Sequence, residues 1–157
     1  MAFPVVLDHL SQGFSSSATS HAVDMPSFVG VDNLLLLFTS VDSGKSVNTP
    51  SGWTQIYEGD NATANCFAKK ADGTEGGTTL AILSPTTCTV STQLYNIIDW
   101  DGTIATGINV STQESRSSTS IPPDALTAAW GAGDTLWLAV VHAYDDDATI
   151  TGYPSGY

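Results

Sequence analysis

The sequence predicts an all-β protein, an antiparallel β-sandwich of jelly-roll-like form, for three reasons. Short runs rich in Val, Ile, Thr and aromatic residues alternate with Gly, Asp, Asn, Ser and Pro, which is typical of strands joined by turns. No long segment places apolar residues at three- and four-residue spacing, so long helices are not expected. The end of the chain also nearly repeats an earlier stretch, and an internal repeat of this kind indicates a repeated structural unit.

The strands follow from these runs and the turn residues that separate them. In chain order they are expected at residues 3–7, 21–25, 34–41, 54–57, 64–70, 78–83, 93–100, 117–121, 136–143 and 149–151. Residues 21–25 alternate between polar and apolar, which indicates one solvated face. Residues 34–38 are apolar without alternation, which predicts a strand covered on both faces or packed centrally. Residues 15–17 are three serines and predict an exposed loop or edge strand.

The repeat consists of a turn Asp, an apolar strand, a polar tip and a Pro-Ser-Gly-aromatic corner. The first copy begins at Asp32 and ends at Trp53, and the second begins at Asp134 and ends at Tyr157. In each corner, proline presets one turn angle and glycine accepts the positive one, so the aromatic that follows can point inward. Trp53 and Tyr157 are therefore expected to anchor the core.

The chain of 157 residues divides into three expected parts. Residues 1–20 form an N-terminal arm or first strand, and residues 21–130 form the sandwich domain. Residues 131–157 begin a second repeat unit, packed on the first or completed by a neighbouring subunit. Tips at residues 42–44, 58–61 and 72–74 contain Asp, Asn and Gly, which tolerate left-handed backbone in hairpin-type turns.

Charge and cysteine content narrow the classes of partner. Four basic residues stand against sixteen acidic ones, giving a net charge of -12. This balance disfavours binding to nucleic acid and to anionic membranes, because both depend on basic side chains. The apolar runs are too short to span a bilayer. Cys66 and Cys88 could pair if their strands were neighbours, but two unpaired cysteines buried in strands are the favoured interpretation.

One motif suggests an enzyme. Asp99 and Asp101, two residues apart in Asp-Trp-Asp-Gly-Thr, resemble the nucleophile and the acid/base of haloacid-dehalogenase-type phosphatases, with Asp145–Asp147 as conceivable metal ligands. The rest of the sequence argues against a phosphatase. That chemistry needs a lysine after the motif to stabilise the transition state, but the last lysine is Lys70, and no pattern of helices alternating with parallel strands follows the motif. The preferred interpretation is a strand end followed by a turn.

Other candidate sites are weaker. His9, His21 and His142 lack the paired spacing of zinc ligands, and residues 145–147 lack a calcium-loop register. Gly73, Gly76 and Gly77 are followed by no Lys-Ser/Thr of a phosphate loop. The sequence therefore predicts no catalytic, cofactor-binding or metal-ligating residue and no enzyme.

Five motifs, taken in order, resemble a known family. They are Asp-Asn-Leu-Leu-Leu at 32–36, Pro-Ser-Gly-Trp-Thr at 50–54, Lys-Ala-Asp-Gly-Thr-Glu-Gly-Gly at 70–77, Trp-Asp-Gly-Thr at 100–103 and Gly-Asp-Thr-Leu-Trp at 133–137. Their succession is similar to uncharacterised β-rich virion proteins of tailed, often marine, bacteriophages. The resemblance covers most of the chain and implies a capsid decoration (cement) subunit or a tail-associated component. It supplies no catalytic residues.

The expected function is therefore a capsid decoration subunit on the outer surface of the phage head, made in the bacterial cytoplasm. It would bridge neighbouring copies of the major capsid protein as a homo-oligomer, with a trimer favoured. The N-terminal segment is the candidate docking arm. The alternative is a tail or fibre module that binds host-surface carbohydrate on exposed aromatics, with Trp100, Trp130, Tyr144 and Tyr153 as candidates.

Overall fold

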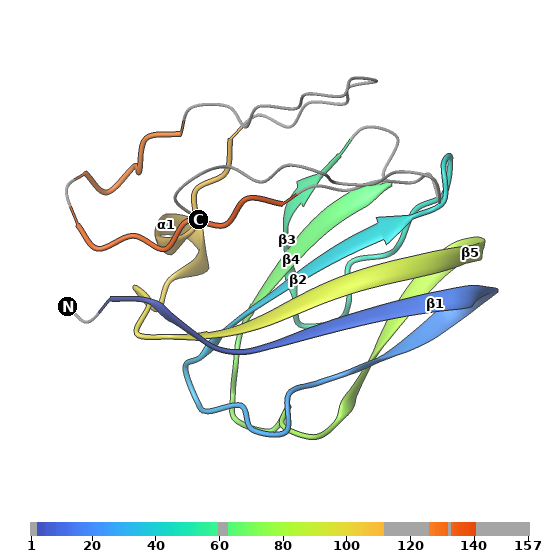
Figure 1. The fold of residues 1–157 in the computed structure, drawn as a ribbon, viewed down its shortest axis with the longest axis horizontal. Helices are drawn as coiled ribbons and strands as arrows, with labels where there is room; N and C mark the ends of the chain where they lie inside the picture. Colours follow the sequence, from blue (N-terminus) through green and yellow to red (C-terminus); the bar gives the residue numbers. More distant parts are fainter. Residues whose placement is uncertain (1–2, 60–62, 112–125, 132, 141–157) are drawn as a thin grey trace.

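A computed structural model describes residues 3–59, 63–111, 126–131 and 133–140. The described chain is all-β, and five antiparallel strands form one sheet in the order β1-β5-β2-β4-β3 (Figure 1). Apart from the strands, it contains a helix of four residues, α1 (Ile104–Gly107). The predicted all-β class is confirmed at this level.

The centre of the sheet agrees closely with the sequence. Strand β2 (Leu34–Val41) lies between β4 (Ala64–Lys70) and β5 (Thr79–Ile98), and both β2 and β4 occupy the predicted ranges. All residues of β2 are buried except Ser40, because its side chains contact apolar groups on both faces of the sheet. The absence of alternation in residues 34–38 therefore did report a strand covered on both sides.

The far edge of the sheet is short. Strand β3 (Thr54–Glu58) pairs with β4 and is one residue longer than predicted. Its ladder shifts register between Gln55 and Tyr57, so Ile56 forms a bulge. A bulge increases local twist and makes such an edge a poor template for further pairing.

The two longest strands correct the predicted boundaries. Residues 3–7 and 21–25 were expected as separate strands, yet β1 (Val5–Asp24) is continuous. The strands expected at 78–83 and 93–100 are likewise parts of one strand, β5, which begins at Thr79 and ends at Ile98. Both strands bend back together at the same end of the sheet (Figure 1). Ser15–Ser17 in β1 and Pro85 in β5 lie at the bend, and such residues interrupt a sequence pattern without ending the chain's extended path. Strand β1 also crosses residue 20, at which the sequence suggested a boundary.

The inner face of the sheet carries the larger core. Side chains of the sheet meet those of the returning arms of β1 and β5, so that Leu35 and Phe67 pack in one cluster with Val23 and Ile82, all with no exposed surface. We call this the inner cluster; its buried members are Val23, Met25, Val29, Leu35, Leu37, Val41, Val47, Trp53, Phe67, Ala71, Ile82, Cys88, Val90 and Leu94.

The opposite face carries a second group of apolar side chains, which we call the outer cluster. Its buried members are Leu34, Leu36, Phe38, Cys66, Ala68 and Ile97. Trp100, Ile104 and Ile108, from the segment around α1, pack against it, as do Leu136 and Val140. The short helix and the later segment therefore cover this face of the sheet.

The strand predicted at residues 136–143 is wrong over its described part, because residues 136–140 form no strand. Leu136 and Val140 bury part of their surface on the outer cluster by side-chain contact alone, whereas Trp137 is 44% exposed. The apolar run thus reflected contact with the sheet rather than strand pairing. The rest of the second repeat copy, with Tyr157, and the strands expected at 117–121 and 149–151 lie outside the described residues.

The described corner of the repeat behaves as predicted. The amide of Trp53 donates to the carbonyl of Pro50 at 3.1 Å, and Gly52 has a φ of 79°. The indole of Trp53 is 8% exposed and belongs to the inner cluster, so its predicted role as a core anchor is confirmed.

Candidate functional site

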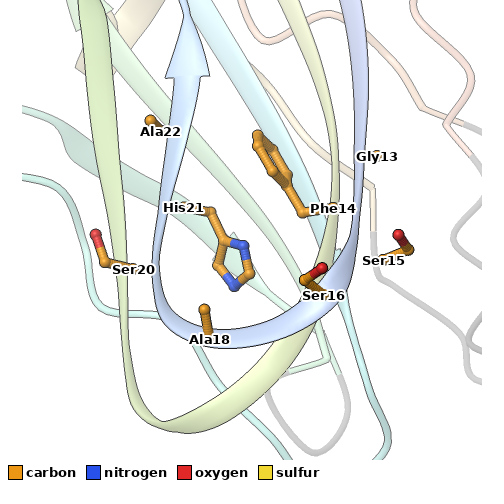
Figure 2. Close-up of a pocket in the computed structure, with 8 residues that line it drawn as sticks. All are labelled: Gly13, Phe14, Ser15, Ser16, Ala18, Ser20, His21 and Ala22. Carbon is orange, nitrogen blue, oxygen red and sulfur yellow. The ribbon is translucent and has the colours of Figure 1, made fainter.

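The bend of β1 forms an open surface hollow of about 380 Å³. Eight residues between Gly13 and Ala22 line it, and all belong to β1 itself; Ser17 and Thr19 do not take part. Figure 2 shows Phe14 on one arm of the bend and His21 on the other, with their rings between the arms. Because the turn is made of Ser and Ala residues, no large side chain fills the space at its base.

His21 is the most buried polar group of this pocket. Its side chain is 4% exposed, and its Nε2 lies 3.0 Å from the carbonyl oxygen of Cys88. A carbonyl only accepts, so Nε2 carries the hydrogen. The other ring nitrogen, Nδ1, is then an acceptor in the neutral imidazole, and no side chain or backbone group of the described chain donates to it. The ring packs against Phe14, with centroids 5.2 Å apart.

Polar contacts from neighbouring loops fix the bend of β5 that supports the pocket. Ser84 donates its hydroxyl to the carbonyl oxygens of Ser46, at 2.6 Å, and Thr86, at 2.7 Å. The carboxylate of Asp42 accepts from the amide of Thr89 at 3.0 Å and from the hydroxyl of Thr89. The hydrogen bonds from the Thr89 hydroxyl and amide hold the pKa of Asp42 below its usual value.

A second candidate surface is the free edge of β1. Strand β1 pairs with β5 on both sides of the bend, and no other described strand borders it. A register shift between Val6 and Asp8 leaves Leu7 out of the ladder, after which residues 8–14 keep an even register. Two carboxylates, Asp8 and Asp24, are the charged residues of β1, so the lysines that often protect an edge are missing.

Apolar side chains are exposed at the start of this edge. Phe3, Val5 and Leu7 have exposed fractions of 49%, 45% and 48%. Scattered apolar side chains are normal on a surface, but these three lie at alternate positions along one short segment next to unpaired backbone groups. This segment lies within the predicted N-terminal arm.

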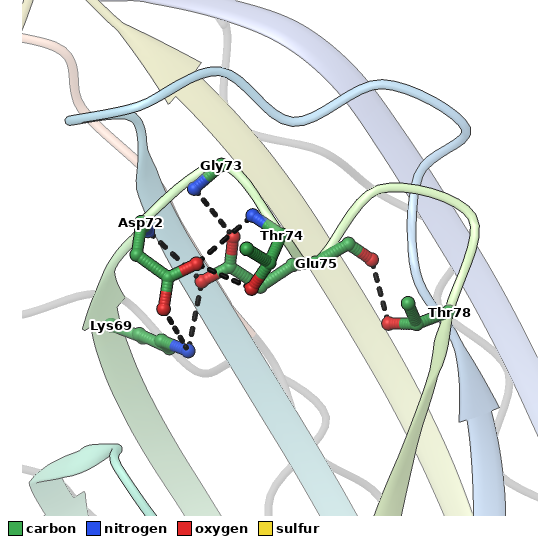
Figure 3. A network of polar contacts seen from close by, with 6 residues as sticks. All are labelled: Lys69, Asp72, Gly73, Thr74, Glu75 and Thr78. Carbon is green, nitrogen blue, oxygen red and sulfur yellow. Dashed lines mark hydrogen bonds and ion pairs between the residues drawn. The ribbon is translucent and has the colours of Figure 1, made fainter.

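A cluster of charges between β4 and β5, in contrast, stabilises a turn (Figure 3). Glu75, 8% exposed, accepts from Lys69 Nζ at 2.8 Å and from the amides of Asp72 at 3.1 Å and Gly73 at 3.0 Å. Burial opposes ionisation of Glu75, but the hydrogen bonds from Lys69 and the amides outweigh it, so the pKa stays below its usual value. The predicted turn at 72–74 is thus present, with Gly73 at a φ of 89°.

The predicted histidine and metal candidates lie apart. His9 is exposed on β1, where its Nε2 lies 2.5 Å from Gln93 Oε1, while His21 is buried at the bend. Within the described ranges, no group of three or more His, Cys, Asp or Glu side chains is placed to hold a metal ion. His142 and residues 145–147 lie outside those ranges.

The phosphatase-like motif has a local structural role. Asp99 directly follows β5 with a φ of 59°, and Asp101 Oδ2 accepts from the hydroxyl of Thr106 at 3.1 Å. The sheet that precedes them is antiparallel, whereas the resembled chemistry uses the end of a parallel strand. Lys70, the last lysine of the chain, is paired with Asp32 at 3.1 Å.

Of the four aromatics proposed as carbohydrate platforms, two are described. Trp100 is half-buried against the outer cluster, and its indole N–H donates to the carbonyl of Asp32 at 2.6 Å. Trp130 is 41% exposed and donates to the hydroxyl of Thr135 at 3.2 Å. Tyr144 and Tyr153 are not among the described residues. Phe14 was not predicted as a site residue, because its proximity to His21 depends on the bend.

The two cysteines are free and buried, as the favoured interpretation held. Cys66 belongs to the outer cluster and Cys88 to the inner cluster, so the sheet separates their thiols. Burial raises the pKa of Cys66 to about 12. The pKa of Tyr57 is also raised, mainly by burial and to a smaller extent by the nearby Cys66. A thiol so rarely ionised is a poor nucleophile.

Comparison with known proteins adds no assignment: no family model, curated protein or solved structure matches this chain. In the part of the chain that the structure describes, no helix has both the length and the apolar character needed to cross a membrane.

Proposed function

We propose that the chain is a non-catalytic structural protein of a phage particle, a capsid decoration subunit that bridges major capsid proteins on the outer head surface. The observation that carries the proposal is the free edge of β1, twenty residues long and bordered by exposed apolar side chains at its start. Between its register shifts, the stretch of residues 8–14 keeps an even ladder and contains no lysine, and an edge of this kind favours pairing with a strand of another protein.

Charge supports this assignment. A net charge of -12 suits a surface that faces away from packaged DNA, and it disfavours direct contact with nucleic acid or an anionic membrane. The partners we propose are the major capsid protein and other copies of this chain, with a trimer favoured. Many modest contacts on one particle give strong overall attachment through multivalency.

The proposal extends to the architecture. In it, the returning arms of β1 and β5 serve as the second layer of a jelly-roll-like sandwich, because their side chains Val23 and Ile82 pack on the sheet across the inner cluster. The second repeat unit, residues 131–157, would pack on the outer cluster through Leu136 and Val140 rather than add a strand to the sheet as Leu34–Val41 does. Its completion by a neighbouring subunit would link folding to assembly.

The test measures attachment to particles. Mass spectrometry of purified virions should detect the protein, and heads stripped of it should bind the isolated protein again. The double substitution V5K/L7K should weaken this binding by about tenfold or more, because two half-exposed apolar side chains no longer become buried.

Leu83→Lys is the matched control, since Leu83 is also 48% exposed but lies on β5. It should bind like the wild type. Intact virions that lack the protein would refute the proposal, as would equal weakening by the control substitution.

A further inference from the structure

The pocket at the bend of β1 is a built concavity with no charged lining group. Its lining consists of Gly, Ala and Ser residues together with Phe14 and His21. Binding sites for small molecules combine apolar contact area with a few directed polar groups, and their volumes begin near 300 Å³. The pocket of about 380 Å³ is therefore large enough for one ring-sized ligand.

The directed polar group is His21. Its Nε2 is engaged by the carbonyl of Cys88 at 3.0 Å, which fixes the orientation of the ring. That contact leaves Nδ1 as an acceptor on a side chain that is 96% buried, since its exposed fraction is 4%. Since His21 lines the pocket, Nδ1 can accept a hydrogen bond from a ligand hydroxyl in place of water.

Two further groups complete the site. Phe14 is half-buried, so part of its ring is accessible beside the imidazole. Figure 2 shows Ser16 at the base of the bend, between the arms and near His21. The hydroxyl of Ser16 forms no hydrogen bond within the described chain and can both donate and accept.

We propose that this pocket binds one neutral sugar residue of a glycan. A sugar ring offers an apolar C–H face to Phe14 and hydroxyl groups to His21 Nδ1 and Ser16. The ligand should be uncharged, because the pocket supplies no cation and the whole protein carries a charge of -12.

This inference does not depend on the proposed attachment to capsids. Sugar binding is a property of the isolated protein, whereas attachment is measured on particles. Variants at residues 14 and 16 therefore test the pocket, and variants at residues 5 and 7 test the edge, so either proposal can fail alone.

The experiment is an NMR titration of the isolated full chain with the methyl glycosides of glucose, galactose, mannose and N-acetylglucosamine. At least one should shift amide resonances of residues 13–22 with a dissociation constant in the millimolar range. The same ligand should also shift the ¹⁵N resonance of His21 Nδ1, which a purely structural imidazole would not show.

Ser16→Ala and Phe14→Leu should each weaken binding about three- to tenfold, because one removes a hydrogen bond and the other an aromatic face. Ser17→Ala is the matched control: it lies in the same bend but does not line the pocket, and it should bind like the wild type. Glycerol and glucuronic acid serve as competing probes.

Three results would overturn the proposal. They are the absence of shifts at residues 13–22 with every glycoside, equal loss of affinity in S16A and S17A, and binding of glycerol or glucuronic acid as tightly as the best neutral glycoside. Unchanged chemical shifts elsewhere in S16A and F14L would show that both variants are folded, so a loss of binding could be assigned to the pocket.

Discussion

Replacing Thr39 with valine should stabilise the protein. Thr39 lies on β2 opposite Asn65 and Thr92, and it shares the inner face of the sheet with Leu37 and Val41. Its side chain is completely buried, and its hydroxyl has no hydrogen-bond partner among the described residues. Valine has nearly the same shape but replaces this hydroxyl with a methyl group.

The magnitude follows from two contributions. A buried polar group left without a partner costs about 1–3 kcal/mol, and burying one further methyl group contributes about 0.8 kcal/mol. Allowing for partial relaxation around the hydroxyl, we expect T39V to raise the free energy of unfolding by about 1–2 kcal/mol. For a chain of this size, each kcal/mol raises the melting temperature by about 2–4 °C.

Urea unfolding followed by tryptophan fluorescence and differential scanning calorimetry would both measure the change. Thr92→Val is the matched control on the neighbouring strand, because Thr92 is equally buried but its hydroxyl donates to the carbonyl of Gln12 at 3.4 Å. This variant loses a hydrogen bond and should be neutral or destabilised by about 1 kcal/mol. If T39V were destabilised as much as T92V, the reasoning about the unpaired hydroxyl would be refuted.

Three further predictions concern the turn at Glu75, the hydrogen bonds between Asp42 and Thr89, and the two thiols. Glu75→Ala should lower the free energy of unfolding by about 3 kcal/mol, because it leaves Lys69 and two amides without their buried acceptor. In the same urea assay D72N, at a carboxylate that is 61% exposed, should leave the free energy of unfolding nearly unchanged. The folded-state pKa of Asp42 is lowered, so its contribution to folding stability is present above the unfolded-state pKa and is lost as the pH falls through the folded-state pKa. D42N should therefore be less stable than the wild type by about 1 kcal/mol at neutral pH, and this difference in stability should disappear in acid. A difference in stability that does not depend on pH would contradict the role of the Asp42 carboxylate. Cys66 and Cys88 should react with Ellman's reagent slowly in the native protein and rapidly in guanidinium chloride, and fast native labelling would show that their burial is incomplete.

The sequence was most informative where a residue pattern and its environment agree. The apolar run of β2 predicted its limits and its coverage on both faces, because only a central strand avoids exposing one side of such a run. The Pro-Ser-Gly corner predicted the inward direction of Trp53 for a similarly local reason.

The missed features depend on contacts between distant segments. Ser15–Ser17 and Pro85 interrupt the strand pattern, yet β1 and β5 remain extended through the bend, where the ladder between them is reduced to the pair Ala18 and Cys88 and resumes on both sides. The pocket between Phe14 and His21 exists only once that bend has formed, so spacing along the chain carried no signal for it. Burial of polar residues such as Thr39 likewise follows from register across strands.

The role of β1 as a contact surface is tested most directly by electron cryo-microscopy of intact particles of a phage that encodes this chain. The proposal predicts density for the protein on the outside of the head, with the free edge of β1 against a capsid protein or a second copy. Density in which that edge faces solvent, or particles that contain no copy of the protein, would contradict it.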